Sequence, residues 1–128
     1  MNLYILLDVT KLESENVASL QSQLPMIAEQ ISFFISQETS LQGQYIERQL
    51  QQPMLSEFAL GLSFSVKQKK HLAKPIAFFN QLAEQYKQDF VLGEVINDQG
   101  QQNFEPVCYF GYEEGLGDSY LIAEYVFY

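Results

Sequence analysis

Two stretches of the chain place branched or aromatic apolar residues at alternate positions and so form one strongly apolar face, which is the pattern of a β-strand that buries that face. In the first stretch, residues 2–9, the apolar positions are Leu3, Ile5, Leu7 and Val9. The second stretch, residues 58–66, has bulky apolar side chains on one face and only small ones on the other: Ala59, Gly61, Ser63 and Ser65. Because a small face lets another backbone or a helix approach closely, we expect tight packing there.

Three further stretches repeat apolar residues with the 3.6-residue period of a helix. Residues 10–13 have the spacing of a capping box and predict a helix over about 11–22, with Val17 and Leu20 inward. Pro25 suits a first helical turn and predicts a second helix over 25–38. Pro75 predicts a third helix, whose apolar face is formed by Ile76, Phe79, Leu82, Ala83 and Tyr86.

The glutamine-rich stretch from 39 to 53 fits no single pattern. Gln42 and Gly43 indicate a turn, and residues 45–50 fit either a short helix or a strand.

The last third of the chain has the pattern of a β-meander. Short connections between strands imply antiparallel neighbours. Pro106 precedes one of the predicted strands, where a missing ladder N–H is tolerated. The elements expected are strands at 90–96, 107–112 and 120–128, a turn at 97–100 and a loop at 113–118.

Together these elements predict an α+β fold in one domain, residues 1–128. A mainly antiparallel sheet of four or five strands ends in the C-terminal β-meander, and the helices lie on one face. Tyr109 and Phe110, as neighbours in a strand, should point to opposite faces of that sheet.

Charge is distributed unevenly over this fold. The formal net charge is −9, yet residues 88–128 contain no Lys, Arg or His. That segment holds eight of the 16 acids and nine of the 18 aromatic residues. An acidic surface with Tyr and Phe is suited to a basic protein partner, whereas nucleic acids and anionic membranes would be repelled.

The composition also points to a compartment. With one cysteine, Cys108, no intramolecular disulfide can form, which favours a reducing environment. No signal peptide or membrane span is visible, so we expect a soluble, cytoplasmic protein. A short basic cluster precedes the third predicted helix: Lys67, Lys69, Lys70, His71 and Lys74. We expect these side chains to be solvated and to pair with the acidic end of the chain.

No pattern of catalytic, metal-binding or cofactor-binding residues stands out. A Cys108–His71 dyad is disfavoured because Cys108 lies inside a predicted strand, whereas reactive cysteines prefer accessible, electropositive sites. Glu113, Glu114 and Asp118 surround two glycines, but their spacing does not match a calcium loop. We therefore expect no catalytic residue, no metal and no cofactor.

A small, acidic, cytoplasmic α+β protein without catalytic motifs resembles the immunity proteins of bacterial polymorphic-toxin systems, including contact-dependent growth inhibition. The resemblance concerns size, charge and the lack of catalytic residues over the whole chain. It implies a complex with a toxin domain, often a nuclease, whose active site or essential surface is blocked. Because these families share no common motif, it assigns no residue.

The leading hypothesis is therefore a binding protein that neutralises a basic partner, in particular an immunity protein that blocks a toxin nuclease through its acidic C-terminal third. The predicted contact residues lie in or near turns: Asp98, Glu105, Tyr112, Glu113, Glu114, Asp118 and Tyr120. One alternative is a structural or regulatory subunit that forms a homo-oligomer, such as a dimer joined through an exposed edge at residues 120–128. Another is an enzyme that uses Glu113 and Glu114 as acid, base or metal ligands.

Overall fold

The computed structural model describes residues 1–8, 14–49 and 58–127. The predictions for Val9, for the capping box at residues 10–13, for residues 50–53 and for Tyr128 lie outside this range, as does the predicted inward side chain of Val17.

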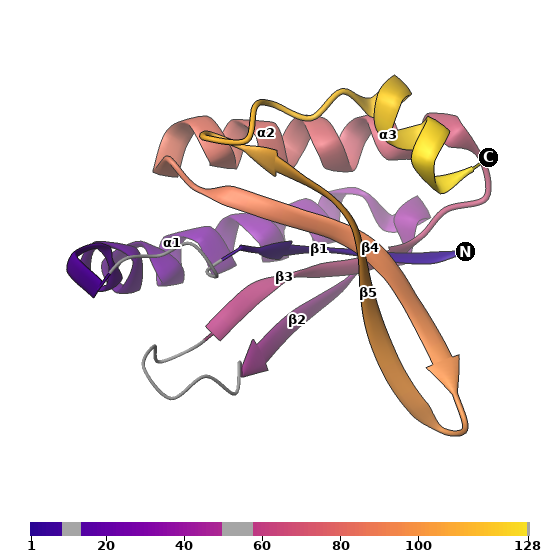
Figure 1. Cartoon of the computed structure of the whole chain (residues 1–128), viewed down its shortest axis with the longest axis horizontal. Coiled ribbons are helices and arrows are strands. Elements are labelled where there is room, and N and C mark those ends of the chain that lie inside the picture. Colours follow the sequence, from indigo (N-terminus) through magenta and orange to yellow (C-terminus); the bar gives the residue numbers. More distant parts are fainter. Residues whose placement is uncertain (9–13, 50–57, 128) are drawn as a thin grey trace.

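A five-stranded antiparallel sheet forms the centre of the fold (Figure 1). Its order is β2-β3-β1-β4-β5, so the N-terminal strand lies in the middle and β5 lies at an edge. The strands are β1 (Asn2–Leu7), β2 (Gln44–Gln49), β3 (Phe58–Ser65), β4 (Asp89–Asp98) and β5 (Gln101–Gly111). The expected α+β fold with an antiparallel sheet is confirmed, and residues 44–49 adopt the strand alternative.

Three α-helices pack on one face of this sheet: α1 (Ser14–Gln37), α2 (Ala73–Tyr86) and α3 (Ser119–Val126). Short 3-10 turns, η1 (Thr39–Leu41) and η2 (Lys69–Leu72), join helices to strands. None of the helices in the described ranges is long and apolar enough to cross a membrane.

The main core lies between the helices and the sheet. Alternate residues of β1, namely Leu3, Ile5 and Leu7, are fully buried in a cluster that also contains side chains from all three helices. Phe79 of α2 meets Phe90 of β4 edge to face, with ring centroids 5.0 Å apart. Each such buried side chain contributes roughly 1.5–3 kcal/mol, which makes this layer the main source of stability.

The opposite face of the sheet carries a smaller cluster. Tyr4 and Leu6 are buried there among residues of other strands, and the rings of Tyr4 and Phe104 meet edge to face at 5.0 Å. The small face predicted for β3 also lies here and allows close approach, because a Cβ on Gly61 would be 1.9 Å from the Ile5 carbonyl oxygen.

The prediction of two helices separated at Pro25 is wrong, because α1 continues through that residue. Proline cannot donate the hydrogen bond that continues the helical ladder, which costs about 3 kcal/mol in a helix interior. A stripe of buried residues on both sides of Pro25 outweighs this cost: Leu20, Ile27, Ile31 and Phe34.

The prediction of a final strand at 120–128 is also wrong, because residues 119–126 form α3. Ile122, Ala123 and Val126, which are spaced as one helical face, are buried against the core. The segment is apolar at nearly every position and therefore also fits strand alternation, which misled the prediction.

The strand predicted at 107–112 begins earlier, at Gln101, and ends at Gly111. Pro106 thus lies inside β5, where the register with β4 shifts between Leu92 and Gly93. An edge strand at a bulge tolerates proline because no ladder bond is lost on its open side. The turn predicted at 97–100 is shorter, because residues 97 and 98 belong to β4, and Gln99 and Gly100 connect the two strands at positive φ.

Candidate functional site

The segment after β5 forms a loop at residues 112–118 that is held against the sheet. The Gly111 N–H donates to the Gly115 carbonyl at 2.8 Å, which turns the chain back along the outer side of β5. Asp89 Oδ1 accepts from the N–H groups of Glu113 at 2.9 Å and Glu114 at 3.1 Å. These hydrogen bonds fix the backbone of Glu113 and Glu114, so their exposed carboxylates extend from an ordered part of the chain.

The end of the loop is anchored to α2. Asn80 exchanges two hydrogen bonds with Gly117, one as donor at 2.9 Å and one as acceptor at 2.8 Å. There is little room for a larger residue, since a Cβ on Gly117 would lie 2.9 Å from the ring of Phe110. The end of the loop is therefore held in one backbone conformation.

Asp118 then begins α3. Its Oδ1 accepts from the N–H groups of Tyr120 at 2.9 Å and Leu121 at 3.3 Å, which is the arrangement of a helix N-cap. Because Ile122, Ala123 and Val126 face the core, the helix turns Leu121 and Tyr125 outward, where they are 61% and 66% exposed. The predicted contact residue Asp118 thus has a structural role as well.

Exposed apolar side chains concentrate around this loop. Of the ten large hydrophobic residues that are exposed in the described part of the chain, seven lie between residues 107 and 125. They are Val107, Tyr109, Tyr112, Leu116, Tyr120, Leu121 and Tyr125. Tyr109 is half exposed while its neighbour Phe110 is buried, so the two point to opposite faces as predicted.

A pocket of about 190 Å³ lies between β5, the loop and α3. Glu114 and Asp118 are the acidic residues among its lining, and the remaining lining is largely apolar. The other lining residues are Cys108, Tyr109, Phe110, Gly115, Leu116, Gly117, Leu121, Ile122 and Tyr125.

No protein-family model, curated protein or solved structure matches this chain.

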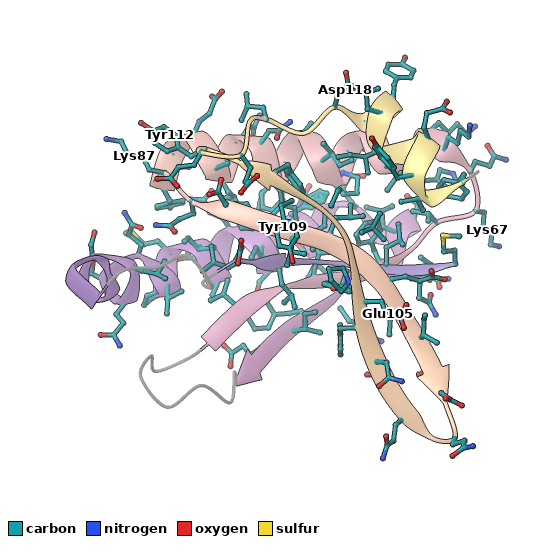
Figure 2. All side chains as sticks on the ribbon, viewed as in Figure 1. Lys67, Lys87, Glu105, Tyr109, Tyr112 and Asp118 are labelled. Carbon is teal, nitrogen blue, oxygen red and sulfur yellow. The ribbon has the colours of Figure 1, made fainter. Side chains whose placement is uncertain are left out.

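The seven predicted contact residues are all exposed, but the fold does not gather them all (Figure 2). Glu114 and Asp118 share the pocket, and Glu113 is next to them. Tyr112 begins the loop and Tyr120 lies in the first turn of α3, and neither lines the pocket. Glu105 lies farther along β5, inside the strand rather than near a turn, and Asp98 lies at the far end of the β4–β5 hairpin (Figures 1 and 2).

Sequence reasoning missed the apolar part of the pocket, notably Tyr109, Leu116, Leu121 and Tyr125. A signal was present: Asp118 is a favourable N-cap, and Leu121 and Tyr125 are four residues apart, on one side of a helix. In a strand that spacing places them on one face too, so only the cap could have decided between the two readings.

The chemistry of Cys108 is that of a partly buried thiol. Burial raises the pKa of the Cys108 thiol, the opposite of the shift that activates a cysteine nucleophile. His71 Nδ1 accepts from the Lys67 N–H at 3.3 Å. Among the side chains that the structure describes, no three His, Cys, Asp or Glu residues come together as metal ligands.

The basic cluster is partly paired with acids. Lys69 Nζ lies 3.7 Å from Glu124 of α3, and Lys74 Nζ lies 3.2 Å from Glu38. Exposed pairs of this kind contribute roughly 0–1 kcal/mol. The Lys69–Glu124 pair agrees with the expected contact between the basic cluster and the acidic end of the chain.

A second cavity, of about 210 Å³, lies away from this loop and is lined mainly by uncharged polar side chains. Its lining includes Asn2, Gln44, Ser63, Asn97 and Gln102. No titratable side chain lines it among the described residues, so it offers hydrogen bonds but no acid–base chemistry.

Proposed function

We propose that this protein binds and neutralises a basic protein partner in the cytoplasm, as an immunity protein that blocks a toxin nuclease. The binding surface is named here the acidic aromatic surface. It consists of the seven exposed apolar residues of the segment 107–125 together with the neighbouring acids Glu105, Glu113, Glu114, Asp118 and Glu124.

The proposal rests on one observation: exposed hydrophobic residues and a lack of basic residues occur in the same part of the chain. Most of the exposed large hydrophobic residues lie in the segment 107–125, and residues 88–128 lack any Lys, Arg or His. Clustered apolar exposure marks interaction sites, because scattered exposure is the norm for a monomer. The carboxylates among these side chains select a partner of opposite charge.

A nuclease is the kind of basic partner that fits this chemistry. Its active-site cleft must hold phosphates and therefore concentrates positive charge. Carboxylates of the acidic aromatic surface would accelerate encounter with such a cleft, while Tyr and Leu side chains supply the buried area that slows dissociation. Blocking of the cleft needs no catalytic residue in this chain.

The homo-oligomer alternative is less well supported. It rested on an exposed strand at 120–128, whereas residues 119–126 form α3. The sheet has two edge strands, β2 and β5, and β5 carries Glu105 and Pro106, which both oppose pairing with another strand. Two copies would also bring like charges together on this side.

The test begins with a pull-down from lysate of the source cells at low and moderate salt, read by mass spectrometry. Retention of one basic nuclease-like protein at moderate salt is expected. Recovery of the bait alone, or of a metabolic assembly, would overturn the proposal.

The captured partner then allows a charge-reversal test. The variant E113K/E114K should bind the partner more weakly, mainly through a slower association rate. Asp118 is left unchanged because a lysine there would also uncap α3. The control E29K/E84K changes the net charge equally at two exposed glutamates of α1 and α2. Equal affinities for the two variants would remove residues 113 and 114 from the interface.

A further inference from the structure

We propose that the pocket between β5 and α3 binds a single arginine side chain of the basic partner. This inference rests on the proposed function and assigns the anchoring contact within the acidic aromatic surface.

The size of the pocket favours one side chain. Sites for small molecules and cofactors are usually roughly 300–1,000 Å³, whereas this pocket measures about 190 Å³. Interfaces commonly gain most of their affinity from a few such anchors, in which a long side chain fills a pocket at the centre of a polar rim.

The lining matches both halves of an arginine. Leu116, Leu121 and Ile122 offer apolar surface for the methylene stem. Tyr109 and Tyr125 contribute aromatic rings from β5 and α3, and both side chains are about half exposed or more. A planar guanidinium stacks on such rings, whereas a lysine ammonium is more strongly hydrated and presents no flat face.

The charges around the pocket select a cation. Glu114 and Asp118 both line it, and the described lining includes no basic side chain. The N-cap bonds of Asp118 use Oδ1, so Oδ2 lies outside the cap. The helix dipole places about half a positive charge at the N-terminus of α3. The full negative charge of Asp118 outweighs it, so this end of the pocket attracts a cation.

The rim of the pocket is already ordered in the free protein. The Gly111–Gly115 and Asn80–Gly117 hydrogen bonds fix the loop, and the N-cap fixes the start of α3. Binding therefore requires little ordering of the backbone, which favours affinity. A second copy of this chain is a poor source of the guanidinium, because Arg48 is its one arginine.

The inference can be tested without the partner, by NMR titration of the labelled protein with N-acetyl-argininamide. The neutral isostere N-acetyl-citrullinamide serves as the matched ligand. The expected result is a saturable shift of the amides of Tyr109, Leu116, Leu121 and Tyr125 with the arginine compound alone. Tyr125→Ala should weaken this binding about two- to fivefold. Phe33→Ala should leave it unchanged, because Phe33 is 66% exposed on α1, outside the acidic aromatic surface, and does not line the pocket.

Equal shifts with both ligands, no saturable shift, or shifts spread over all acidic residues would overturn the inference. So would shifts that depend on the protein concentration alone, which would indicate a second copy in the pocket. Once a basic partner is known, weaker capture by Tyr125→Ala than by Phe33→Ala would support the inference. Equal capture by both would overturn it and leave the proposed function standing, whereas failure to find any basic partner would overturn the proposed function.

Discussion

Asn80 and Gly117 form a two-way hydrogen-bonded pair that joins α2 to the loop before α3. The Asn80 side chain donates to the Gly117 carbonyl at 2.9 Å and accepts from the Gly117 N–H at 2.8 Å. One amide side chain thus satisfies both backbone groups of a residue 37 positions away. Since the candidate pocket is built on this loop, a core helix sets its shape.

Asn80→Ala should destabilise the protein and loosen the loop. Both bonds are partly buried, so the variant leaves the Gly117 N–H and carbonyl poorly satisfied, at a cost of about 1–3 kcal/mol. Urea unfolding gives the change in free energy, and hydrogen exchange at Gly117 and the first turn of α3 locates it. Gln81→Ala, at an exposed neighbour on the same helix, should change neither. Equal behaviour of the two variants would contradict a clamping role.

The sequence was sufficient to predict those strands and helices in which the buried residues recur with one regular spacing, every second residue in a strand or every 3.6 residues in a helix. The strand predicted at 58–66 and the apolar face of α2 are confirmed because one face of each is buried and the other is small or polar. The antiparallel sheet and the helices on one face followed from the same patterns. Local periodicity is a sound guide wherever one face meets the core and the other does not.

The elements that failed are those in which tertiary contacts override a local signal. Pro25 is a strong helix breaker, yet buried residues on both sides of it hold α1 together. In α3, apolar residues outside the core-facing side, such as Leu121 and Tyr125, hide the helical period. The acidic residues of the candidate site were visible in the sequence, but its apolar pocket depends on α3, for which the Asp118 N-cap was the one deciding signal.

The charge of Asp118 and its capping role can be separated by two substitutions. Asp118→Ala removes the acceptor for the Tyr120 and Leu121 N–H groups and should cost about 0.5–2 kcal/mol. Asp118→Asn keeps an acceptor oxygen but removes the charge, so its stability should stay close to that of the wild type. Thermal unfolding compares the three proteins. If Asp118→Asn is as unstable as Asp118→Ala, the carboxylate charge rather than the hydrogen bonds stabilises α3.

Gly61→Ala and Gly100→Ala should destabilise the protein for different reasons. At Gly61 there is no space for a Cβ, whereas at Gly100 there is space but the backbone conformation is unfavourable for alanine. At Gly61 a Cβ would lie 1.9 Å from the Ile5 carbonyl oxygen, so Gly61→Ala must separate β3 from β1. We expect a loss of more than about 3 kcal/mol, or no folded protein at all.

At Gly100 a Cβ would meet nothing within 4 Å, but φ is +82°, where alanine is strained. Gly100→Ala should cost about 1 kcal/mol and Gly100→Asn less, because asparagine tolerates this region. Chemical denaturation of the three variants gives the order. A similar cost for Gly61→Ala and Gly100→Ala would show that the close approach of β1 and β3 relaxes easily.

The partly buried thiol of Cys108 should make stability fall at alkaline pH. Burial raises the pKa of this thiol above its ordinary value of roughly 9. Below that value the thiol is neutral in the folded and unfolded chain, and its contribution is constant. As the pH rises further, the unfolded chain releases the proton first, so the free energy of unfolding decreases until the folded thiol also ionises.

At neutral pH, Cys108→Ala should therefore have a lower free energy of unfolding than the wild type. As the pH rises, the free energy of unfolding should decrease less for Cys108→Ala than for the wild type. Burial and Glu47 also raise the pKa of Tyr45, which adds an alkaline loss, but both proteins share that contribution and their difference isolates the thiol. Urea unfolding at a series of pH values from neutral to strongly alkaline measures this difference. Reaction with a disulfide reagent gives an independent check, since the folded thiol should react more slowly than a free cysteine. A constant difference across the series, or fast reaction at neutral pH, would show that the Cys108 thiol is more solvated than its position on β5 implies.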